Sequence, residues 1–222
     1  MKERLINLFG ESNLKKIKNT HILLVGIGGV GSFCFETLIR CGVENITVID
    51  FDTYEESNLN RQLYATIDTL GKKKIDTALA RAKSINENVN INVLDTFLDF
   101  NSDFDFSSYD YIIDACDSVP AKANLILNAK KYNKKIIVSL GIGNRVCPEL
   151  VCKSTLKESL SDPLGKKLNH YLIKKCDFNE NVNVICSKEK PIKSQPISSY
   201  VCTTSVAGIY LSDYVIKDII NG

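Results

Sequence analysis

The sequence predicts an α/β protein with a mainly parallel sheet, helices on both faces of that sheet, and C-terminal strands of mixed direction. Two observations carry this prediction. Short apolar runs alternate with helical patterns over the first two thirds of the chain. These runs are apolar throughout rather than alternating with polar residues, which is typical of parallel strands that are buried on both faces.

The first two thirds of the chain contain the regular alternation. The expected strands span residues 21–25, 46–50, 91–94, 111–115 and 136–140. The expected helices span residues 29–40, 72–86 and 120–132. Ser118 is suited to cap the last of these helices, and Pro120 fits its first turn.

After about residue 145 the regular alternation of strand and helix patterns ends. Strands are expected at 150–153 and 182–186, on either side of a helix at 163–175. The polar stretch 187–199 contains Pro191 and Pro196 and is predicted to be a mobile loop. An amphipathic helix at 203–220 closes the chain. The length of 222 residues suits one domain over residues 1–222.

Composition and charge narrow the class of protein. Hydrophobic residues make up 44% and charged residues 24%, which is ordinary for a globular protein. No stretch approaches the roughly 20 apolar residues of a membrane span, and the charged N-terminus lacks the apolar core of a signal peptide. We therefore expect a cytoplasmic protein with no membrane partner. The net charge of +2 by itself indicates no particular partner.

The cysteines and histidines do not form the patterns expected of a metal site or of histidine catalysis. No pair among the eight cysteines has the Cys-x-x-Cys spacing of a zinc site or a redox pair, so structural zinc is not expected. The two histidines, His21 and His170, lie in an apolar strand and a polar helix, where structural or surface roles are expected.

A glycine-rich turn follows the first expected strand. Gly26, Gly28 and Gly29 belong to a Gly-x-Gly-Gly-x-Gly segment that leads into a helix, as in Rossmann-like nucleotide-binding folds. Asp50 ends the second strand, where a carboxylate can accept hydrogen bonds from a ribose. Taken alone, this pattern favours NAD.

The segments that follow favour a nucleoside triphosphate instead. The loop after Asp50 is polar and carries the residues Asp52, Asn58, Arg61 and Gln62. Lys74 stands at the start of the next helix, and the fourth strand ends in Asp114-x-x-Asp117. Arginine, lysine and a carboxylate at one edge of the sheet suit phosphates and magnesium.

Together these motifs resemble the ThiF/MoeB/HesA superfamily of ubiquitin-activating-enzyme-like adenylating enzymes, from about Leu8 to Ile220. The resemblance implies binding of ATP and Mg²⁺. It also implies a nucleotide-binding Rossmann half at 1–145 and a substrate and dimer half at 146–222. The residues expected to bind nucleotide are Gly26, Gly28, Gly29, Asp50, Asp52, Asn58, Arg61, Gln62, Lys74 and Asp117.

Within that set, the resemblance gives particular roles to several residues. Gly28 and Gly29 are expected to cradle the nucleotide and Asp50 to hold the ribose. Asn58, Arg61 and Lys74 are expected to contact the phosphates, and Asp117 to bind magnesium. Arg61, Lys74 and Asp117 are the expected catalytic residues, because the positive charge of Arg61 and Lys74 would stabilise the charge that develops when a phosphate is attacked.

Further segments resemble one branch of the superfamily, the tRNA threonylcarbamoyladenosine dehydratases. They are Arg4 to Gly10, Gly141 to Pro148, Asp162-Pro163-Leu164, Ser187-x-Glu189 and Ser205 to Gly208. This resemblance implies ATP-dependent dehydration of threonylcarbamoyladenosine in tRNA, by activation of its carboxylate and closure of a ring. A tRNA partner would give a role to Lys166, Lys167, Lys174 and Lys175, which are otherwise typical of a solvated helix face.

Alternatives remain open at this stage. One is adenylation of the C-terminus of a ubiquitin-like sulfur carrier, and another is an NAD-binding module. Cys186 stands where the branch often has an aromatic residue, and a role as sulfur acceptor or acyl carrier, with a possible sulfur-transfer partner, is a further hypothesis. The resemblance also implies a homodimer, for which the apolar closing helix is a candidate interface.

Overall fold

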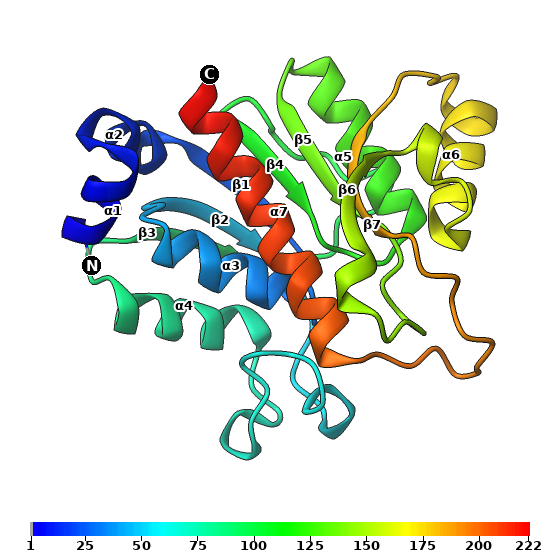
Figure 1. Ribbon diagram of the computed structural model, residues 1–222, viewed down its shortest axis with the longest axis horizontal. Coiled ribbons are helices and arrows are strands. Elements are labelled where there is room, and N and C mark those ends of the chain that lie inside the picture. Colours follow the sequence, from blue (N-terminus) through cyan, green and yellow to red (C-terminus); the bar gives the residue numbers. More distant parts are fainter. Residues whose placement is uncertain (1) are drawn as a thin grey trace.

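The computed structural model describes residues 2–222 and contains a seven-stranded sheet with helices on both faces (Figure 1). The strand order is β3-β2-β1-β4-β5-β7-β6. All neighbouring strands are parallel except β6 and β7, which are antiparallel. The strands are β1 (His21–Val25), β2 (Asn45–Ile49), β3 (Asn90–Leu94), β4 (Tyr111–Asp114), β5 (Lys135–Ser139), β6 (Val151–Thr155) and β7 (Asn183–Ser187). The predicted fold class is confirmed.

The helices differ from the prediction mainly at the N-terminus. They are α1 (Lys2–Phe9), α2 (Glu11–Asn19), α3 (Gly31–Arg40), α4 (Lys74–Ile85), α5 (Val119–Lys131), α6 (Pro163–Cys176) and α7 (Val201–Asn221). Short 3₁₀ turns lie at Glu56–Asn58, Ile67–Thr69, Pro148–Leu150 and Lys157–Ser159. The helices α1 and α2 were not predicted, and α2 is anchored by its buried residues Leu14 and Ile17. The predicted cap of α5 is present, since the Ser118 side chain accepts a hydrogen bond from the Ala121 backbone N–H.

Alternate side chains of the central strands pack on opposite faces of the sheet. In β1, Ile22 and Leu24 join a core cluster with α3 and α7, whereas Leu23 and Val25 join a second cluster with α5. Side chains alternate in this way along any strand, so a strand covered on both faces must be apolar throughout. This explains the continuous apolar runs in the sequence.

The C-terminal part of the chain completes the same sheet. β7 pairs with β5 in parallel and with β6 in antiparallel orientation, so residues from both predicted halves share one sheet. α7 returns across the sheet and packs against α3, where the Ser212 hydroxyl donates a hydrogen bond to the Cys34 backbone oxygen at 2.9 Å. This crossing brings the N-terminus of α7 close to the glycine-rich turn. Among the described residues, no helix is long and apolar enough to cross a bilayer.

Candidate active site

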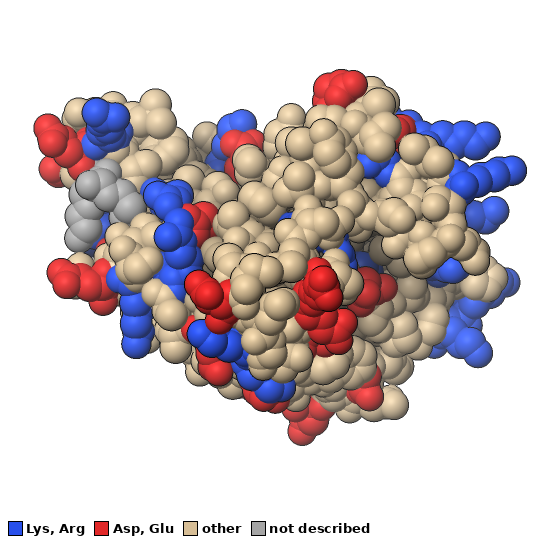
Figure 2. Space-filling model, turned by 90° about the horizontal axis from the view of Figure 1, so that it is seen from below, with Lys and Arg blue, Asp and Glu red and all other residues tan. Residues whose placement is uncertain are grey.

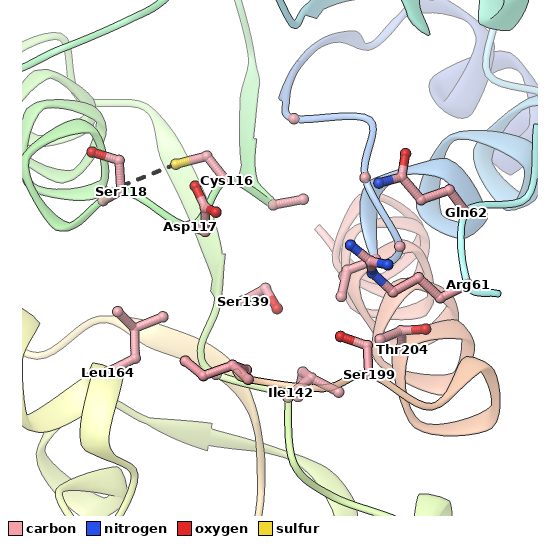
Figure 3. A pocket seen from close by; sticks show the side chains of 18 of the residues that line it. Arg61, Gln62, Cys116, Asp117, Ser118, Ser139, Ile142, Leu164, Ser199 and Thr204 are labelled. Atoms are coloured by element: carbon pink, nitrogen blue, oxygen red, sulfur yellow. Dashed lines mark hydrogen bonds between the residues drawn. The ribbon is translucent and has the colours of Figure 1, made fainter. Parts of the chain in front are cut away.

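A cleft of about 1270 Å³ lies where the carboxyl ends of the central strands meet the connecting loops. Nucleotide sites in open α/β sheets occur at this edge. Figure 3 shows Arg61 and Gln62 on one side of the cleft, Cys116, Asp117 and Ser118 on the opposite side, and Ile142 and Ser199 along a third side. The cleft is large enough for a nucleotide together with part of a second substrate.

The glycine-rich turn forms part of the cleft lining. Gly26 has a φ of 93°, and a Cβ atom there would lie 2.8 Å from the backbone oxygen of Ala115. Glycine is therefore required for the close approach between the ends of β1 and β4. Gly28 and Gly29 line the cleft directly, next to the N-terminus of α3. Of the three predicted glycines, Gly26 shapes the turn most strongly, while Gly28 and Gly29 expose backbone to a ligand.

Asp50 is buried at the end of β2 and is held by backbone donors. Its carboxylate accepts hydrogen bonds from the N–H groups of Ile27 at 2.7 Å and Asp52 at 2.9 Å. Burial raises the pKa of this carboxyl above its usual value, although both backbone bonds and the nearby Lys74 act in the opposite direction. The geometry fixes Asp50 in the cleft lining, where its carboxylate oxygens can also accept bonds from a ribose.

Asp52 and Lys74 form an ion pair at the same edge. The Lys74 Nζ atom lies 2.7 Å from Asp52 Oδ2, and the lysine side chain is only 6% exposed, against 46% for the aspartate. A second link, from the Lys74 N–H to the Asp52 backbone oxygen at 3.1 Å, ties the start of α4 to the loop. Lys74 therefore reaches the cleft as a fixed cation rather than as a freely moving surface lysine.

Asn58, Arg61 and Gln62 lie on the loop between β2 and α4. The Asn58 side chain is buried and accepts the Glu55 N–H at 3.2 Å, so it also holds the loop in shape. The Arg61 guanidinium points into the cleft (Figure 3) and donates to the backbone oxygen of Ser57 at 2.6 Å. Among the described residues, Arg61 has no carboxylate partner, and the buried Gln62 Oε1 has no hydrogen-bond donor. Both side chains therefore retain capacity for a ligand.

Asp117 lies on the turn after β4, across the cleft from Arg61 (Figure 3). Its side chain is exposed, and no hydrogen bond to it is seen within residues 2–222. The turn itself is held by Asp114, which accepts bonds from the Cys116 backbone N–H at 3.1 Å and from the Cys116 thiol at 3.0 Å. Burial, followed by the nearby Asp114 charge, raises the pKa of the Cys116 thiol.

A buried lysine beneath this turn was not identified from the sequence. Lys122 of α5 and Asp114 of β4 are both completely buried, with the Lys122 Nζ atom 3.1 Å and 3.2 Å from the two carboxylate oxygens. The same ammonium group donates to the Ser139 backbone oxygen at 2.7 Å, at the end of β5. Lys122 thus joins the elements that carry Asp117. The only sequence signal for it was its position on the otherwise apolar buried face of a helix.

Three of the five segments that resemble the dehydratase branch, at 141–148, 162–164 and 187–189, come together at one side of the cleft. Arg145 forms a buried ion pair with Asp162, and it donates to the backbone oxygens of Gly141, Gly143 and Glu189. Asp162 also caps α6 through the Gly165 N–H at 2.8 Å. These segments are far apart in the sequence, so their convergence on one ion pair explains why they occur together.

Cys186 lies outside the cleft. It is buried on β7, opposite Cys152 of β6, and its sulfur accepts a hydrogen bond from the Ser159 hydroxyl at 3.3 Å. Burial raises the pKa of this thiol, which keeps it protonated and unreactive at neutral pH. The structure therefore does not favour Cys186 as a sulfur acceptor.

Asp117 is the candidate metal ligand in the cleft. Within the described residues, no group of three or more histidine, cysteine or acidic side chains is arranged to hold a metal ion. The exposed Asp117 carboxylate fits a magnesium ion, because Mg²⁺ is usually bound through one or two carboxylates together with substrate phosphates.

Exposed lysines gather at the α6 end of the molecule. Lys166, Lys167, Lys174 and Lys175 all project into solvent, and Figure 2 shows basic side chains along this end. Lys167 also lines the cleft. A basic surface therefore continues outward from the mouth of the cleft.

The fold and the glycine turn at the end of β1 are those of a Rossmann-like α/β protein. The model of the ThiF family matches residues 2–219, and the chain belongs to this family. The resemblance to the ThiF/MoeB/HesA superfamily is thus confirmed.

Several similar proteins belong to one branch of the family. The chain is 35% identical to the tRNA threonylcarbamoyladenosine dehydratase of Haemophilus influenzae, over 86% of this chain and 74% of that protein. It is 31% identical to the enzyme of the same name from Bacillus subtilis, over 95% of this chain and 91% of that protein. The crystal structure of the Escherichia coli tRNA N6-threonylcarbamoyladenosine dehydratase, TcdA, in complex with AMP superposes with a TM-score of 0.94 at 30% identity, covering 98% of this chain and 93% of that one. The complex of TcdA with ATP gives a TM-score of 0.91 at 28% identity, with the same coverage.

Proposed function

We propose that this protein catalyses the ATP-dependent dehydration of threonylcarbamoyladenosine in tRNA. The observation that carries the proposal is the division of one cleft into two sides. Arg61 and Lys74 supply positive charge on the nucleotide side, while the network of Arg145 and Asp162 builds the substrate side. The dehydratases of Haemophilus influenzae and Bacillus subtilis, which align over most of the chain, support the same reaction.

The chemistry begins with a carboxylate, which is a poor electrophile. Attack of the threonylcarbamoyl carboxylate oxygen on the α-phosphorus of ATP would form a mixed anhydride with AMP and release pyrophosphate, whereas attack on the γ-phosphorus would form an acyl phosphate and release ADP. A nucleophilic atom of the same side chain would then attack the activated carbonyl and lose its proton to the solvent, and the C–O bond to AMP or phosphate would break. The ring closes within one molecule, so proximity lowers the barrier. One carboxylate oxygen leaves on phosphorus, and the nucleoside loses the atoms of one water.

Each predicted residue has a defined task in this reaction. Asp50 would accept hydrogen bonds from the ribose, and the backbone at Gly28 and Gly29 would lie against the nucleotide. Arg61 and Lys74 would stabilise the charge that develops on the attacked phosphate. Mg²⁺, when bound, would neutralise phosphate oxygens, and Asp117 would hold it. Asp52 would orient Lys74, and Asn58 and Gln62 would offer polar groups at the phosphates.

The tRNA would approach from the α6 end. We assign residues 1–145 to nucleotide binding and residues 146–222 to the substrate and dimer surfaces. The lysines Lys166, Lys167, Lys174 and Lys175 would contact the RNA backbone, because phosphate contacts by lysine supply most of the sequence-independent affinity for nucleic acid.

Assembly and location are further parts of the proposal. α7 exposes the apolar side chains of Ile209 and Tyr210, which supports its use as a homodimer interface. A cytoplasmic location is in keeping with a tRNA substrate. A sulfur-transfer partner would need a reactive thiol, and the burial of Cys186 gives it no support.

The test uses tRNA that already carries threonylcarbamoyladenosine. It is incubated with the protein, ATP and Mg²⁺, and the nucleosides are analysed by mass spectrometry at neutral pH. We expect an ATP-dependent loss of one water from the modified adenosine. An unchanged mass, together with pyrophosphate exchange that depends on a ubiquitin-like carrier protein, would instead indicate the carrier-activating function.

A further inference from the structure

The loop between β7 and α7 forms one wall of the cleft although it contains no helix or strand. Pro191, Ile192, Lys193, Ser194 and Ile197 of this loop line the cleft. The sequence alone predicted mobility here. The structure instead shows the loop attached to the segment after β5 at several points.

Asn144 makes most of these attachments. Its φ of 57° is a left-handed conformation that asparagine tolerates better than most residues. Its backbone oxygen accepts the Ile192 N–H at 2.8 Å, and its backbone N–H donates to the Ser198 oxygen at 2.7 Å. Its side chain accepts the Ser198 N–H at 2.7 Å and donates to the Ser194 oxygen at 3.1 Å. One residue therefore holds the loop at three positions.

Both ends of the loop are also fixed. At its start, the Glu189 carboxylate accepts the N–H groups of Val146 and Cys147, each at 2.9 Å. At its end, the Asn60 side chain donates to the Ser199 oxygen at 3.0 Å and accepts a bond from Arg61 Nη1 at 2.9 Å. The loop is thereby connected to the candidate catalytic arginine.

The side chains on this wall suit RNA. Lys193 on the loop and Lys167 on α6 both line the cleft, and neither forms an ion pair with any residue in the range 2–222. Ile192 and Ile197 are 51% and 77% exposed beside them. Free cations next to exposed apolar groups match phosphates next to the flat face of an unstacked base. At Gly143 a Cβ atom would lie 2.6 Å from Ile197 Cγ2, so the loop lies directly on the segment that holds it.

We infer that residues 189–199 form the RNA-binding wall of the cleft and that Asn144 is the positioning residue that holds this wall. The inference rests on the proposed function, since it names the surface that selects the tRNA. Asn144 also lines the cleft, and the role inferred for it is to hold the loop through its side chain.

The test is the Asn144→Gly variant. Glycine adopts a positive φ freely, so this change keeps the backbone bonds and removes only the two side-chain bonds. We expect faster amide exchange at residues 192–199 and a KM for the modified tRNA raised about tenfold, as a loss near 1.4 kcal/mol would give. The kcat and the affinity for ATP should stay within about two-fold. Lys193→Gln should weaken tRNA binding and should reduce the slope of log affinity against log salt concentration by about one.

Asn133→Gly is the matched control, because Asn133 also has a left-handed φ, of 52°, and lies outside the cleft. It should leave tRNA kinetics unchanged. Faster loop exchange in Asn144→Gly with an unchanged KM would overturn the RNA-binding role, and unchanged exchange would overturn the positioning role. A fall in kcat alone would show that the loop serves Arg61 rather than RNA, and would also contradict the inference. If the wild-type protein dehydrates no tRNA, the proposed function fails, and the direct affinity of each variant for the modified tRNA then decides the inference separately.

Discussion

Lys122 and Asp114 form a completely buried ion pair directly beneath the turn that carries Asp117. The lysine reaches from α5 to β4 and donates at the same time to the end of β5. Removing two charges from water carries a large free-energy cost, which such a pair offsets only when both partners are present and well hydrogen-bonded. The pair therefore makes the position of the turn sensitive to either partner.

Removal of one partner of the pair should lower the free energy of unfolding more than removal of both. Lys122→Met leaves the Asp114 carboxylate without its cation, and we expect a loss of about 3–5 kcal/mol in the free energy of unfolding. The double variant Lys122→Met with Asp114→Asn should recover a large part of that loss. Urea unfolding of the three proteins measures the difference. Equal stability of the single and double variants would contradict a coupled pair.

Arg61→Ala should separate catalysis from folding. The guanidinium bonds only to loop oxygens in the described part of the chain, so its removal should leave the unfolding midpoint nearly unchanged. Loss of one donor aimed at the charge that develops in the reaction typically lowers kcat by about 10²–10³-fold. Arg40→Ala is the control, since Arg40 is paired with Glu36 on α3. Turnover of Arg61→Ala within a few-fold of wild type would remove Arg61 from the site.

Asp117→Asn should lower turnover by weakening the binding of magnesium. The variant keeps the size of the side chain but loses the charge that would hold the ion. We expect turnover to fall by orders of magnitude and the residual activity to require more Mg²⁺ for saturation. Titration of activity against Mg²⁺ at saturating ATP makes the measurement. An unchanged magnesium dependence would place the ion elsewhere.

Glu189 should make the loop sensitive to acid. The backbone N–H of Cys147, with that of Val146, holds the pKa of the Glu189 carboxyl below its usual value of 4.5. A lowered pKa in the folded state means that the unfolded chain binds the proton more tightly. The stabilisation by Glu189 is therefore complete above pH 4.5 and is lost as the pH falls through the lower, folded-state value.

Glu189→Gln tests this pH dependence. The variant should be less stable than wild type at neutral pH, and the difference should shrink as the pH falls below the usual value. Thermal unfolding of both proteins at about pH 7 and about pH 3 gives the comparison. A difference that is constant with pH would show that the carboxylate charge is not responsible.

Much of the fold followed from local sequence patterns, and the exceptions have physical causes. The strands and the helices from α3 onward lie within about two residues of their predicted positions, because continuous apolar runs and capping residues mark them locally. The helices α1 and α2 were not predicted because both are short and charged residues recur along them. In α2 the apolar residues are Leu14 and Ile17, which are buried against the rest of the protein.

The candidate site was also predicted only in part. Asp50, Lys74, Arg61 and Asp117 were found from motifs, and the structure brings them to one cleft, while their roles remain predictions. Lys122 escaped notice because a lysine in a helix usually faces solvent, and only Asp114, eight residues earlier, makes burial favourable. The loop after β7 was predicted to be mobile because its sequence is polar and contains prolines. Its anchor, Asn144, lies 54 residues before Ser198, so local sequence patterns do not indicate the contact.

The central claim is that a carboxylate is activated at phosphorus in this cleft. The most direct test uses modified tRNA whose threonylcarbamoyl carboxylate carries heavy oxygen, with ATP, Mg²⁺ and the wild-type protein. We predict that the nucleoside loses one water and that one heavy oxygen atom appears in the AMP or phosphate released. Dehydration with the label in water and none on phosphorus would contradict the account.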